Sequence, residues 1–290
     1  MKNETIFRSA EGRAEILAYY DAVLACWPLP YETYTMPTAQ GETFVLASGP
    51  AEAPPLVLLH GSSANSAMWV SDVADLARGH RVYAVDIPGE PGKSEPVRYE
   101  LDGDLYAGWL DAVLDGLGIE RTALLGLSMG GWFAAHYAGR HPQRITRLAL
   151  LCPGGIAPAR LSFILRAVWL MRFERERGTE RMARFVAGGQ PVAEETIQYT
   201  ALISRAFNPR MALPLLSDAE IAALSMPTLL IVGARDPLLP SAKTAARLGR
   251  LVPRLETIWL PDAGHVLVGH ADKVLAFLLG NEPVVATTAG

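Results

Sequence analysis

Cysteine, long apolar runs and net charge are all scarce in this sequence, and each scarcity excludes a class of protein. The 290 residues include only two cysteines, Cys26 and Cys152, so no disulfide framework is expected. No uninterrupted run of about 18 apolar residues occurs, and we therefore predict no membrane span. The formal net charge of −4 is too small to indicate a surface that binds nucleic acid.

The first residues lack the apolar stretch of a secretion signal, because charged side chains recur throughout residues 1–17. We therefore expect a cytoplasmic protein. The balance of 50% hydrophobic and 19% charged residues is typical of a soluble globular chain. Its length allows one large domain or a core with an insertion, and no internal repeat is visible.

Apolar runs typical of buried strands alternate with segments of helical spacing through most of the chain. An amphipathic helix is predicted over residues 10–27, and two short strands follow at 31–36 and 42–47. Further strands are predicted at 56–60, 81–86, 122–127, 147–152, 227–232 and 255–260, with helices near 66–78, 101–117, 129–140, 241–250 and 268–280. This alternation predicts an α/β fold with a mainly parallel, doubly wound sheet of eight strands.

Residues 154–223 interrupt the alternation, because they show helical patterning and no strand-like run. Ser128 and Asp236 are separated by far more residues than the two core strands predicted between them require. We therefore predict a helical cap at 154–223, inserted into a core formed by residues 1–153 and 224–290. Ligands of parallel α/β sheets bind beyond the carboxyl ends of the strands, so the cap is expected to cover that edge.

The sequence Gly126-Leu127-Ser128-Met129-Gly130 ends one apolar run and begins a segment of helical spacing. A serine flanked in this way is typical of a nucleophile elbow, the sharp strand-to-helix turn that exposes a reactive hydroxyl. Both glycines fit such a turn, since it leaves no room for a Cβ atom two residues on either side of the serine. An ordinary strand-to-helix turn is the alternative, and the rest of the chain decides between the two.

A serine hydroxyl needs a base in order to attack a carbonyl carbon, and the base needs a carboxylate that orients it. Asp236 follows an apolar run that ends at 233, and His265 follows another that ends at 260. The predicted triad is therefore Ser128, His265 and Asp236. Asp262 is the alternative acid, but a loop carboxylate usually faces water. Surface or packing roles are expected for the histidines without a glycine neighbour at a strand end, namely His80, His136, His141 and His270.

Five short motifs together resemble those of the α/β-hydrolase superfamily, in the same order along the chain. They are His60-Gly61, Asp86…Gly89…Gly92…Ser94, Gly126-x-Ser128-x-Gly130, Gly233-x-x-Asp236 and Gly264-His265. The resemblance extends over roughly residues 40 to 282. Within the superfamily the chain resembles serine carboxylesterases, and its 86–94 loop and N-terminal helix are similar to those of bacterial naproxen-type carboxylesterases. The resemblance implies the α/β-hydrolase fold.

The tetrahedral intermediate of ester hydrolysis carries an oxyanion, which two backbone N–H groups stabilise. Met129, the residue after the nucleophile, supplies one of them in a nucleophile elbow. The resemblance to esterases implies Ser62 for the second, with Ser63 as the fallback and as a substrate contact. His60 is expected to shape this loop by hydrogen bonding to its backbone. The loop differs from the H-G-G-G loop of lipase-like esterases and from the His-Gly-Ser-Gly loop of carbon–carbon bond hydrolases.

Further substrate contacts are expected from Trp69, near the oxyanion loop, and from an apolar stripe in the cap. Phe163 and Ala167 belong to that stripe, most of which is expected to pack on the core. Core packing is also the alternative for Trp69. The glycines before Ser94 are not expected to hold a phosphate, because no G-K-S/T motif stands at the required spacing. Neither a cofactor nor a metal ion is expected.

These predictions indicate a serine hydrolase that cleaves small to medium, largely apolar carboxylic esters through an acyl-enzyme. A carbon–carbon bond hydrolase, a lactonase or amidase, and a lyase are alternatives that use the same triad. A ligand receptor that retains the fold without catalysis is a further alternative. Haloalkane dehalogenases and epoxide hydrolases resemble this frame, but they need an aspartate where this chain has Ser128. The oligomeric state does not follow from the sequence.

Overall fold

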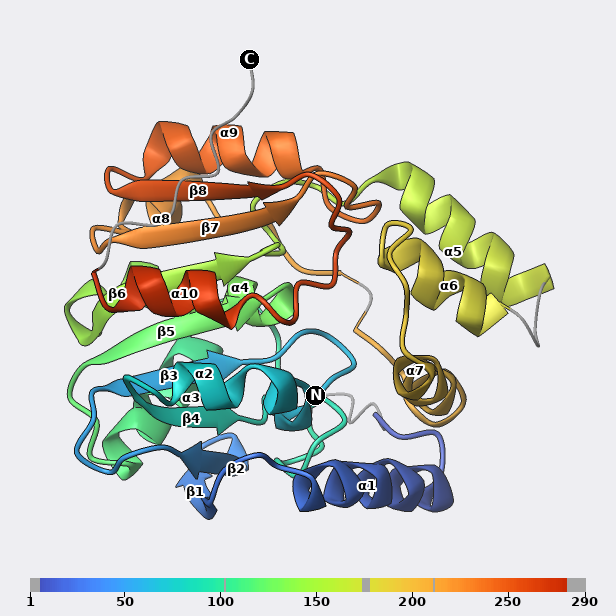
Figure 1. Cartoon of the computed structure of the whole chain (residues 1–290), viewed down its shortest axis with the longest axis horizontal. Coiled ribbons are helices and arrows are strands. Elements are labelled where there is room, and N and C mark those ends of the chain that lie inside the picture. Colours follow the sequence, from blue (N-terminus) through green and yellow to red (C-terminus); the bar gives the residue numbers. More distant parts are fainter. Residues whose placement is uncertain (1–5, 102, 174–177, 211, 281–290) are drawn as a thin grey trace.

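Eight strands form one mixed sheet in the order β1-β2-β4-β3-β5-β6-β7-β8 (Figure 1). The computed structural model describes residues 6–101, 103–173, 178–210 and 212–280. The pairs β1/β2 and β2/β4 are antiparallel, and all other neighbours are parallel. The strands are β1 (Tyr31–Thr38), β2 (Gly41–Ser48), β3 (Pro55–Leu59), β4 (Arg81–Val85), β5 (Thr122–Leu127), β6 (Ile145–Leu151), β7 (Thr228–Gly233) and β8 (Leu255–Leu260). The predicted α/β sheet of eight strands is confirmed.

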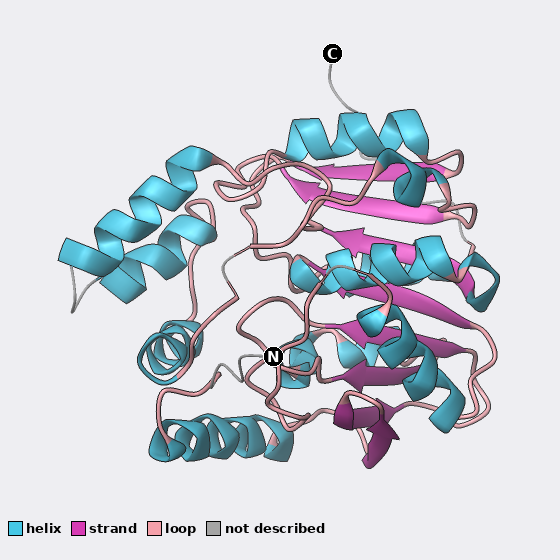
Figure 2. Cartoon of the chain, turned by 180° about the vertical axis from the view of Figure 1, so that it is seen from behind, coloured by secondary structure: helices cyan, strands magenta, loops and turns pink. Residues whose placement is uncertain are grey.

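Helices cover both faces of the sheet (Figure 2). On one face lie α3 (Leu105–Gly116), α4 (Met129–Arg140) and α9 (Ser241–Leu251), whose buried side chains share a core with Leu124 of β5. On the other face lie α2 (Val73–Leu76) and α10 (Ala271–Leu278). The strands β5 and β7 are buried along their whole length, which explains their unbroken apolar sequences.

The prediction of one continuous helix near residues 66–78 is wrong. The chain instead makes a 3-10 helix, Ser66–Ser71, followed by the short α2. Asp72 lies at the junction, and its carboxylate accepts the Gly269 N–H at 2.9 Å. The side chain is therefore bound to the segment before α10, and the helical path changes at this residue.

Three helices between β6 and β7 lie beyond the carboxyl ends of the parallel strands (Figure 1). They are α5 (Leu161–Phe173), α6 (Gly178–Val186) and α7 (Glu194–Ala206). The next helix, α8 (Asp218–Ala222), falls inside the predicted cap range but contacts α4 and α9 on the sheet. Residues 1–5 and 281–290 of the predicted core lie outside the described residues.

The N-terminal helix α1 (Ala10–Ala25) joins the core to these outlying helices. Ser9 caps its N-terminus, and the Ser9 hydroxyl accepts the Gly12 N–H at 3.0 Å. Its last turns pack in the sheet core through Tyr20 and Leu24, while Ile16 packs against α7. Across the described ranges, no helix has the length and apolar content needed to cross a membrane.

The turn between β5 and α4 is packed directly against the end of β3. A Cβ atom at Gly130 would lie 2.0 Å from the carbonyl oxygen of Leu59, and one at Gly126 would lie 2.3 Å from the carbonyl oxygen of Gly130. Both contacts are with backbone atoms, which cannot rotate away as a side chain does. Glycine is therefore required at both positions by space alone.

Replacing Gly130 by alanine is expected to lower the free energy of unfolding by about 3 kcal/mol or more, because backbone must move to admit the methyl group. Gly108→Ala in α3 is the matched control, since nothing lies within 4 Å of its Cβ position. That variant is expected to gain about 0.5–1 kcal/mol from the better helix propensity of alanine. Thermal unfolding of both variants gives the comparison, and equal midpoints would contradict it.

Candidate active site

Ser128 lies between β5 and α4 in a backbone conformation that is rare for residues other than glycine. Its φ is +54° and its ψ is −109°. Three hydrogen bonds hold this residue in place: its N–H donates to Leu151 O at 2.9 Å, and its carbonyl accepts from Trp132 and Gly154 at 3.1 and 2.9 Å. Such strain persists only where the surroundings fix it, and it presents the Ser128 side chain at the carboxyl edge of the sheet.

The structure brings the hydroxyl of Ser128, the ring of His265 and the carboxylate of Asp236 into one hydrogen-bonded chain. His265 Nε2 lies 2.8 Å from Ser128 Oγ, and His265 Nδ1 lies 2.8 Å from Asp236 Oδ2. Because the carboxylate is an acceptor, Nδ1 carries the ring proton and leaves Nε2 free to accept the serine proton. An arrangement of this kind can activate a serine hydroxyl.

Asp236 is 3% exposed and is held by more than the histidine. Its Oδ1 accepts the N–H groups of Leu238 and Leu239 at 2.8 and 2.9 Å. Burial raises the pKa of this carboxyl, but the hydrogen bond and charge of His265 and these two N–H groups outweigh burial. The net pKa is lowered, so the group is a carboxylate at neutral pH.

The alternative acid, Asp262, lies at the surface, outside this hydrogen-bonded chain. Its side chain is 65% exposed and forms an ion pair with Arg235 at 2.6 Å. It thus has the solvent-facing position expected of a loop carboxylate.

The loop after β3 lies against the elbow. A Cβ atom at Gly61 would be 3.1 Å from Leu127 Cδ2 and 3.8 Å from Ser128 Cβ. His60 is fully buried and shapes this loop: its Nε2 accepts the Ile87 N–H at 2.9 Å, so its Nδ1 donates to Gly61 O at 2.9 Å. That carbonyl belongs to the same peptide group as the Ser62 N–H, and His60 therefore orients that N–H.

Two backbone N–H groups beside Ser128 remain for an oxyanion. Met129 is the first residue of α4, and an N–H at that position has no acceptor within the helix. Among the described residues, no hydrogen bond uses the Ser62 N–H, whereas the Gly61 N–H donates to Met68 Sδ at 3.5 Å and the Ser63 N–H to Glu90 at 2.6 Å. Ser63 is therefore disfavoured as the fallback donor.

The expected substrate contacts have mixed placements. Trp69 is 1% exposed and packs in the core with Leu58 and Leu127, so the structure places it as a core residue and not as a pocket wall. Phe163 is partly buried and stacks on Phe185 of α6, with ring centroids 5.8 Å apart. Ala167 is also partly buried on α5. The stripe does not pack on the core as a whole, since Val168 is 61% exposed.

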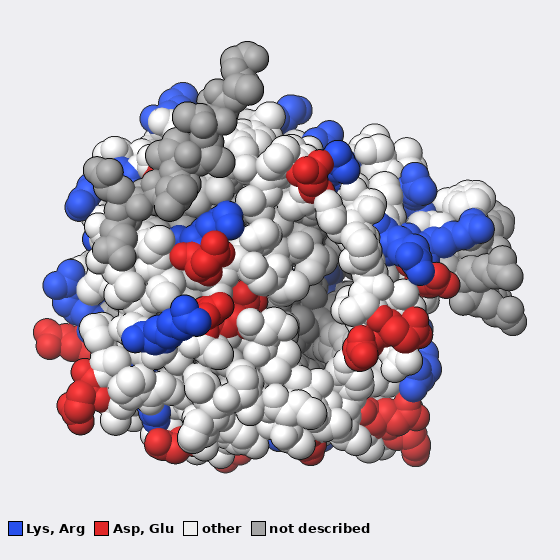
Figure 3. Space-filling model, in the orientation of Figure 1, with Lys and Arg blue, Asp and Glu red and all other residues white. Residues whose placement is uncertain are grey.

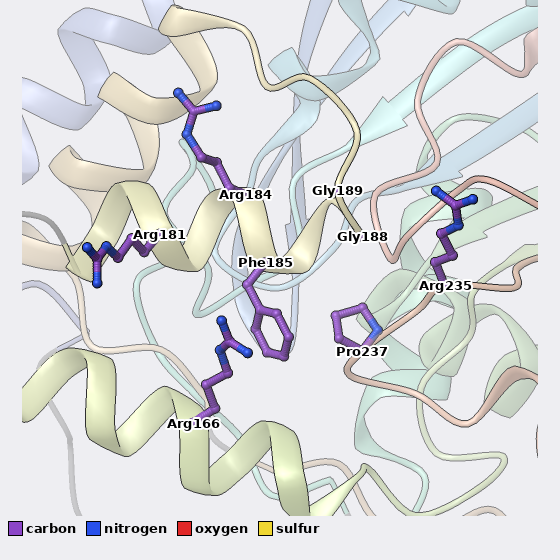
Figure 4. A pocket seen from close by; sticks show the side chains of 8 residues that line it. All are labelled: Arg166, Arg181, Arg184, Phe185, Gly188, Gly189, Arg235 and Pro237. Atoms are coloured by element: carbon purple, nitrogen blue, oxygen red, sulfur yellow. The ribbon is translucent and has the colours of Figure 1, made fainter.

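A hollow of about 610 Å³ opens between α5, α6 and the loop after β7. Phe185 and Pro237 line it, and Arg166 lies against the Phe185 ring (Figure 4). Three more arginines line the hollow: Arg181, Arg184 and Arg235. Pro237 directly follows Asp236 in the chain, so the hollow lies next to the loop that carries Asp236. Figure 3 shows the surface hollowed between the sheet and the outlying helices, with mostly uncharged walls in that view.

Cys152 is the one further candidate metal ligand beside the triad. Its Sγ and the ligand atoms of Asp236 and His265 lie within 4.8 Å of one another, which is the one such group found among the described residues. Burial, and then the charge of Asp236, raise the pKa of the thiol far above its usual range. Zinc binds the thiolate form, and Asp236 and His265 are already bonded to each other, so these residues fit a triad better than a metal centre.

Two residues near this site are absent from the sequence-based prediction. Glu90 is 2% exposed and accepts the Ser63 N–H, and Tyr199 of α7 donates its hydroxyl to Ser63 O at 3.2 Å. Burial raises the pKa of Glu90 to about 7, against the lowering effect of the Ser63 N–H and of Arg98 and Arg210. The position of Glu90 between Gly89 and Pro91, in a loop at the same sheet edge as Ser128, is a sequence signal that could have identified this residue. Nothing in the sequence near Tyr199 identifies it.

The comparisons with known proteins agree with this architecture. The chain matches the model of the alpha/beta hydrolase family over residues 56–277. It is 34% identical over 258 residues to the uncharacterized carboxylesterase nap of Bacillus subtilis (strain 168), covering 86% of this chain and 85% of that protein. It is 30% identical over 290 residues to carboxylesterase YbfK of the same organism, covering 94% and 97%.

Solved structures show the same likeness. The naproxen esterase (carboxylesterase NP) from Bacillus subtilis superposes with a TM-score of 0.82 at 27% identity, covering 94% of this chain and 99% of that one. The similarity therefore extends through the sheet and the helices inserted after β6. Because the family model spans most of the sheet and both relatives match nearly the whole chain, this chain belongs to the alpha/beta hydrolase family.

Proposed function

We propose that the chain is a serine carboxylesterase in which Ser128, His265 and Asp236 form the catalytic triad. The single observation that carries the proposal is the unbroken hydrogen-bonded chain from Ser128 Oγ through His265 to the buried Asp236. The similarity to two proteins named as carboxylesterases supports it, because both match nearly the full length of the chain.

In the first half of the proposed reaction, Ser128 Oγ attacks the ester carbonyl carbon and His265 Nε2 takes the hydroxyl proton. The carbonyl oxygen becomes an oxyanion, which the N–H groups of Ser62 and Met129 stabilise. Asp236 stabilises the imidazolium that has formed. His265 then returns the proton to the departing alkoxide, the carbon–oxygen bond of the ester breaks, and an alcohol leaves the acyl-enzyme.

In the second half, a water molecule replaces the alcohol. His265 takes a proton from the water, whose oxygen attacks the acyl carbon, and the same N–H groups stabilise the second oxyanion. Collapse of the intermediate returns the proton to Ser128 Oγ and releases the carboxylic acid. The cycle consumes one ester and one water and requires no redox partner.

The proposed substrates are small to medium, largely apolar esters. The support for this is that Phe185 of α6 and Pro237 of the loop after β7 line the hollow, which four arginines line as well. The proposed cap comprises residues 154–223, with α5 to α7 over the carboxyl edge of the sheet. A cytoplasmic location is proposed as well, and both cysteines are free thiols, as is common in a reducing compartment.

The acyl-enzyme is tested with a short-chain p-nitrophenyl ester and with a fluorophosphonate, which modifies an activated serine once and is not hydrolysed. We expect ester turnover, together with one phosphonyl adduct by intact mass, and we expect Ser128→Ala to lose both. Absence of turnover and adduct in the unsubstituted chain, across acyl chain lengths, would refute the esterase proposal. Turnover of a dienoate or a cyanohydrin in place of esters would favour a carbon–carbon bond hydrolase or a lyase.

Asp236→Asn is expected to lower kcat by about 10⁴-fold, because an amide can donate to Nδ1 and thereby favours the wrong tautomer of His265. Asp262→Asn is the matched control from the same edge of the sheet. It removes only the exposed ion pair with Arg235, and such pairs contribute little. Steady-state kinetics on the p-nitrophenyl ester compare the two, and a similar loss in both variants would show that Asp236 has no special role.

A further inference from the structure

Ser63, the residue after the proposed oxyanion donor, has a backbone conformation that needs support. Its φ is +60°, in the left-handed region that residues other than glycine rarely adopt. Both of its backbone polar groups are engaged by side chains from distant parts of the chain. Neither of those side chains has a place in the triad chemistry described above.

The N–H of Ser63 is held from the core. Glu90 lies in the loop between β4 and α3, and its Oε2 accepts this N–H at 2.6 Å. The carboxyl group is 2% exposed, and its Oε1 lies 3.9 Å from Arg98 Nη2. Arg98 in turn donates through Nε to Gly89 O at 3.1 Å, which fixes the same loop. A buried acceptor of this kind meets little competition from water for its donor.

The carbonyl of Ser63 is held from the cap. The Tyr199 hydroxyl donates to it at 3.2 Å from α7, and the Tyr199 ring packs on Tyr19 of α1 with centroids 5.1 Å apart. Tyr19 itself donates to the Glu195 carbonyl at 3.3 Å, at the start of α7. The position of Tyr199 therefore depends on how α7 rests on α1.

Three successive peptide groups of the loop are thus pinned. His60 binds the carbonyl of the Gly61–Ser62 peptide, Glu90 binds the N–H of the Ser62–Ser63 peptide, and Tyr199 binds the carbonyl of the peptide after Ser63. The Ser62 N–H belongs to the first of these groups. His60 sets its direction, and Glu90 and Tyr199 keep the two peptide groups that follow from rotating.

We propose that Glu90 and Tyr199 are positioning residues, which clamp Ser63 from both sides and so aim the Ser62 N–H at the oxyanion. This inference rests on the proposed esterase function and names a further part of the same site. The clamp joins one residue of the core to one residue of the cap, so the oxyanion site is complete only when α7 is docked.

Tyr199→Phe tests the clamp, because it removes the hydroxyl and keeps the ring. We expect kcat on the p-nitrophenyl ester to fall about tenfold with KM within twofold, a smaller loss than the ~100-fold that removal of an oxyanion donor itself causes. A trifluoromethyl ketone, which forms an oxyanion on the serine, is expected to bind about tenfold more weakly. Tyr34→Phe is the control, because it removes a hydroxyl that bonds to the exposed Glu32 on β1, and it is expected to keep both values.

Substitutions of Glu90 provide a second test of the clamp. Glu90→Gln retains an oxygen acceptor for the Ser63 N–H and is expected to keep most of kcat, whereas Glu90→Ala is expected to lose about tenfold or more. Thermal unfolding shows which variants are folded. A loss that is the same for Tyr199→Phe and Tyr34→Phe, or that affects KM and not the ketone, would overturn the clamp. Failure of the unsubstituted chain to react with the fluorophosphonate would remove the esterase proposal and the clamp together.

Discussion

The backbone of Ser128 turns through a left-handed conformation between β5 and α4, and the neighbouring elements close tightly around it. Space for the turn exists only because Gly126 and Gly130 carry no Cβ atom, and the carbonyl of Leu59 occupies the place that a methyl group at Gly130 would need. The same close approach brings the loop after β3 alongside the serine. Strain at one residue and tight packing at its neighbours thus arrange the proposed nucleophile and the proposed oxyanion loop together.

The polar groups of the site are arranged so that charge can form and disappear without a change in structure. Asp236 is buried, yet its oxygens accept hydrogen bonds from His265, Leu238 and Leu239. A positive charge that appears on His265 therefore meets a fixed negative partner in a place that water hardly reaches. The helices inserted after β6 also help to hold His265, because its backbone N–H donates to Val186 O at the end of α6 at 2.9 Å.

The sequence predicted best what is decided locally. Strand runs such as 122–127 and 255–260 have the bounds predicted from their apolar patterns, and a glycine-flanked serine was enough to locate the turn at Ser128. Features decided by tertiary contacts were predicted less well. The helix at 66–78 breaks where Asp72 bonds to Gly269, and Trp69 lies in the core and not in a pocket wall. Tyr199 is 136 residues from its partner Ser63, and no local pattern reports such a contact.

The helix α1 contacts both the sheet core and the inserted helices. At one end the Tyr20 hydroxyl donates to the buried Asp86 at 3.0 Å, and at the other Gly12 lies so close to Ala206 of α7 that a Cβ atom there would be 2.8 Å away. In a chimaera in which residues 154–223 are replaced by those of a relative, the relative's α7 would lack the α1 surface against which it packs. The helix α1 and the inserted helices therefore have to be exchanged together, although they lie far apart in the chain. A change of substrate specificity by such an exchange would require the transfer of α1 along with the inserted helices.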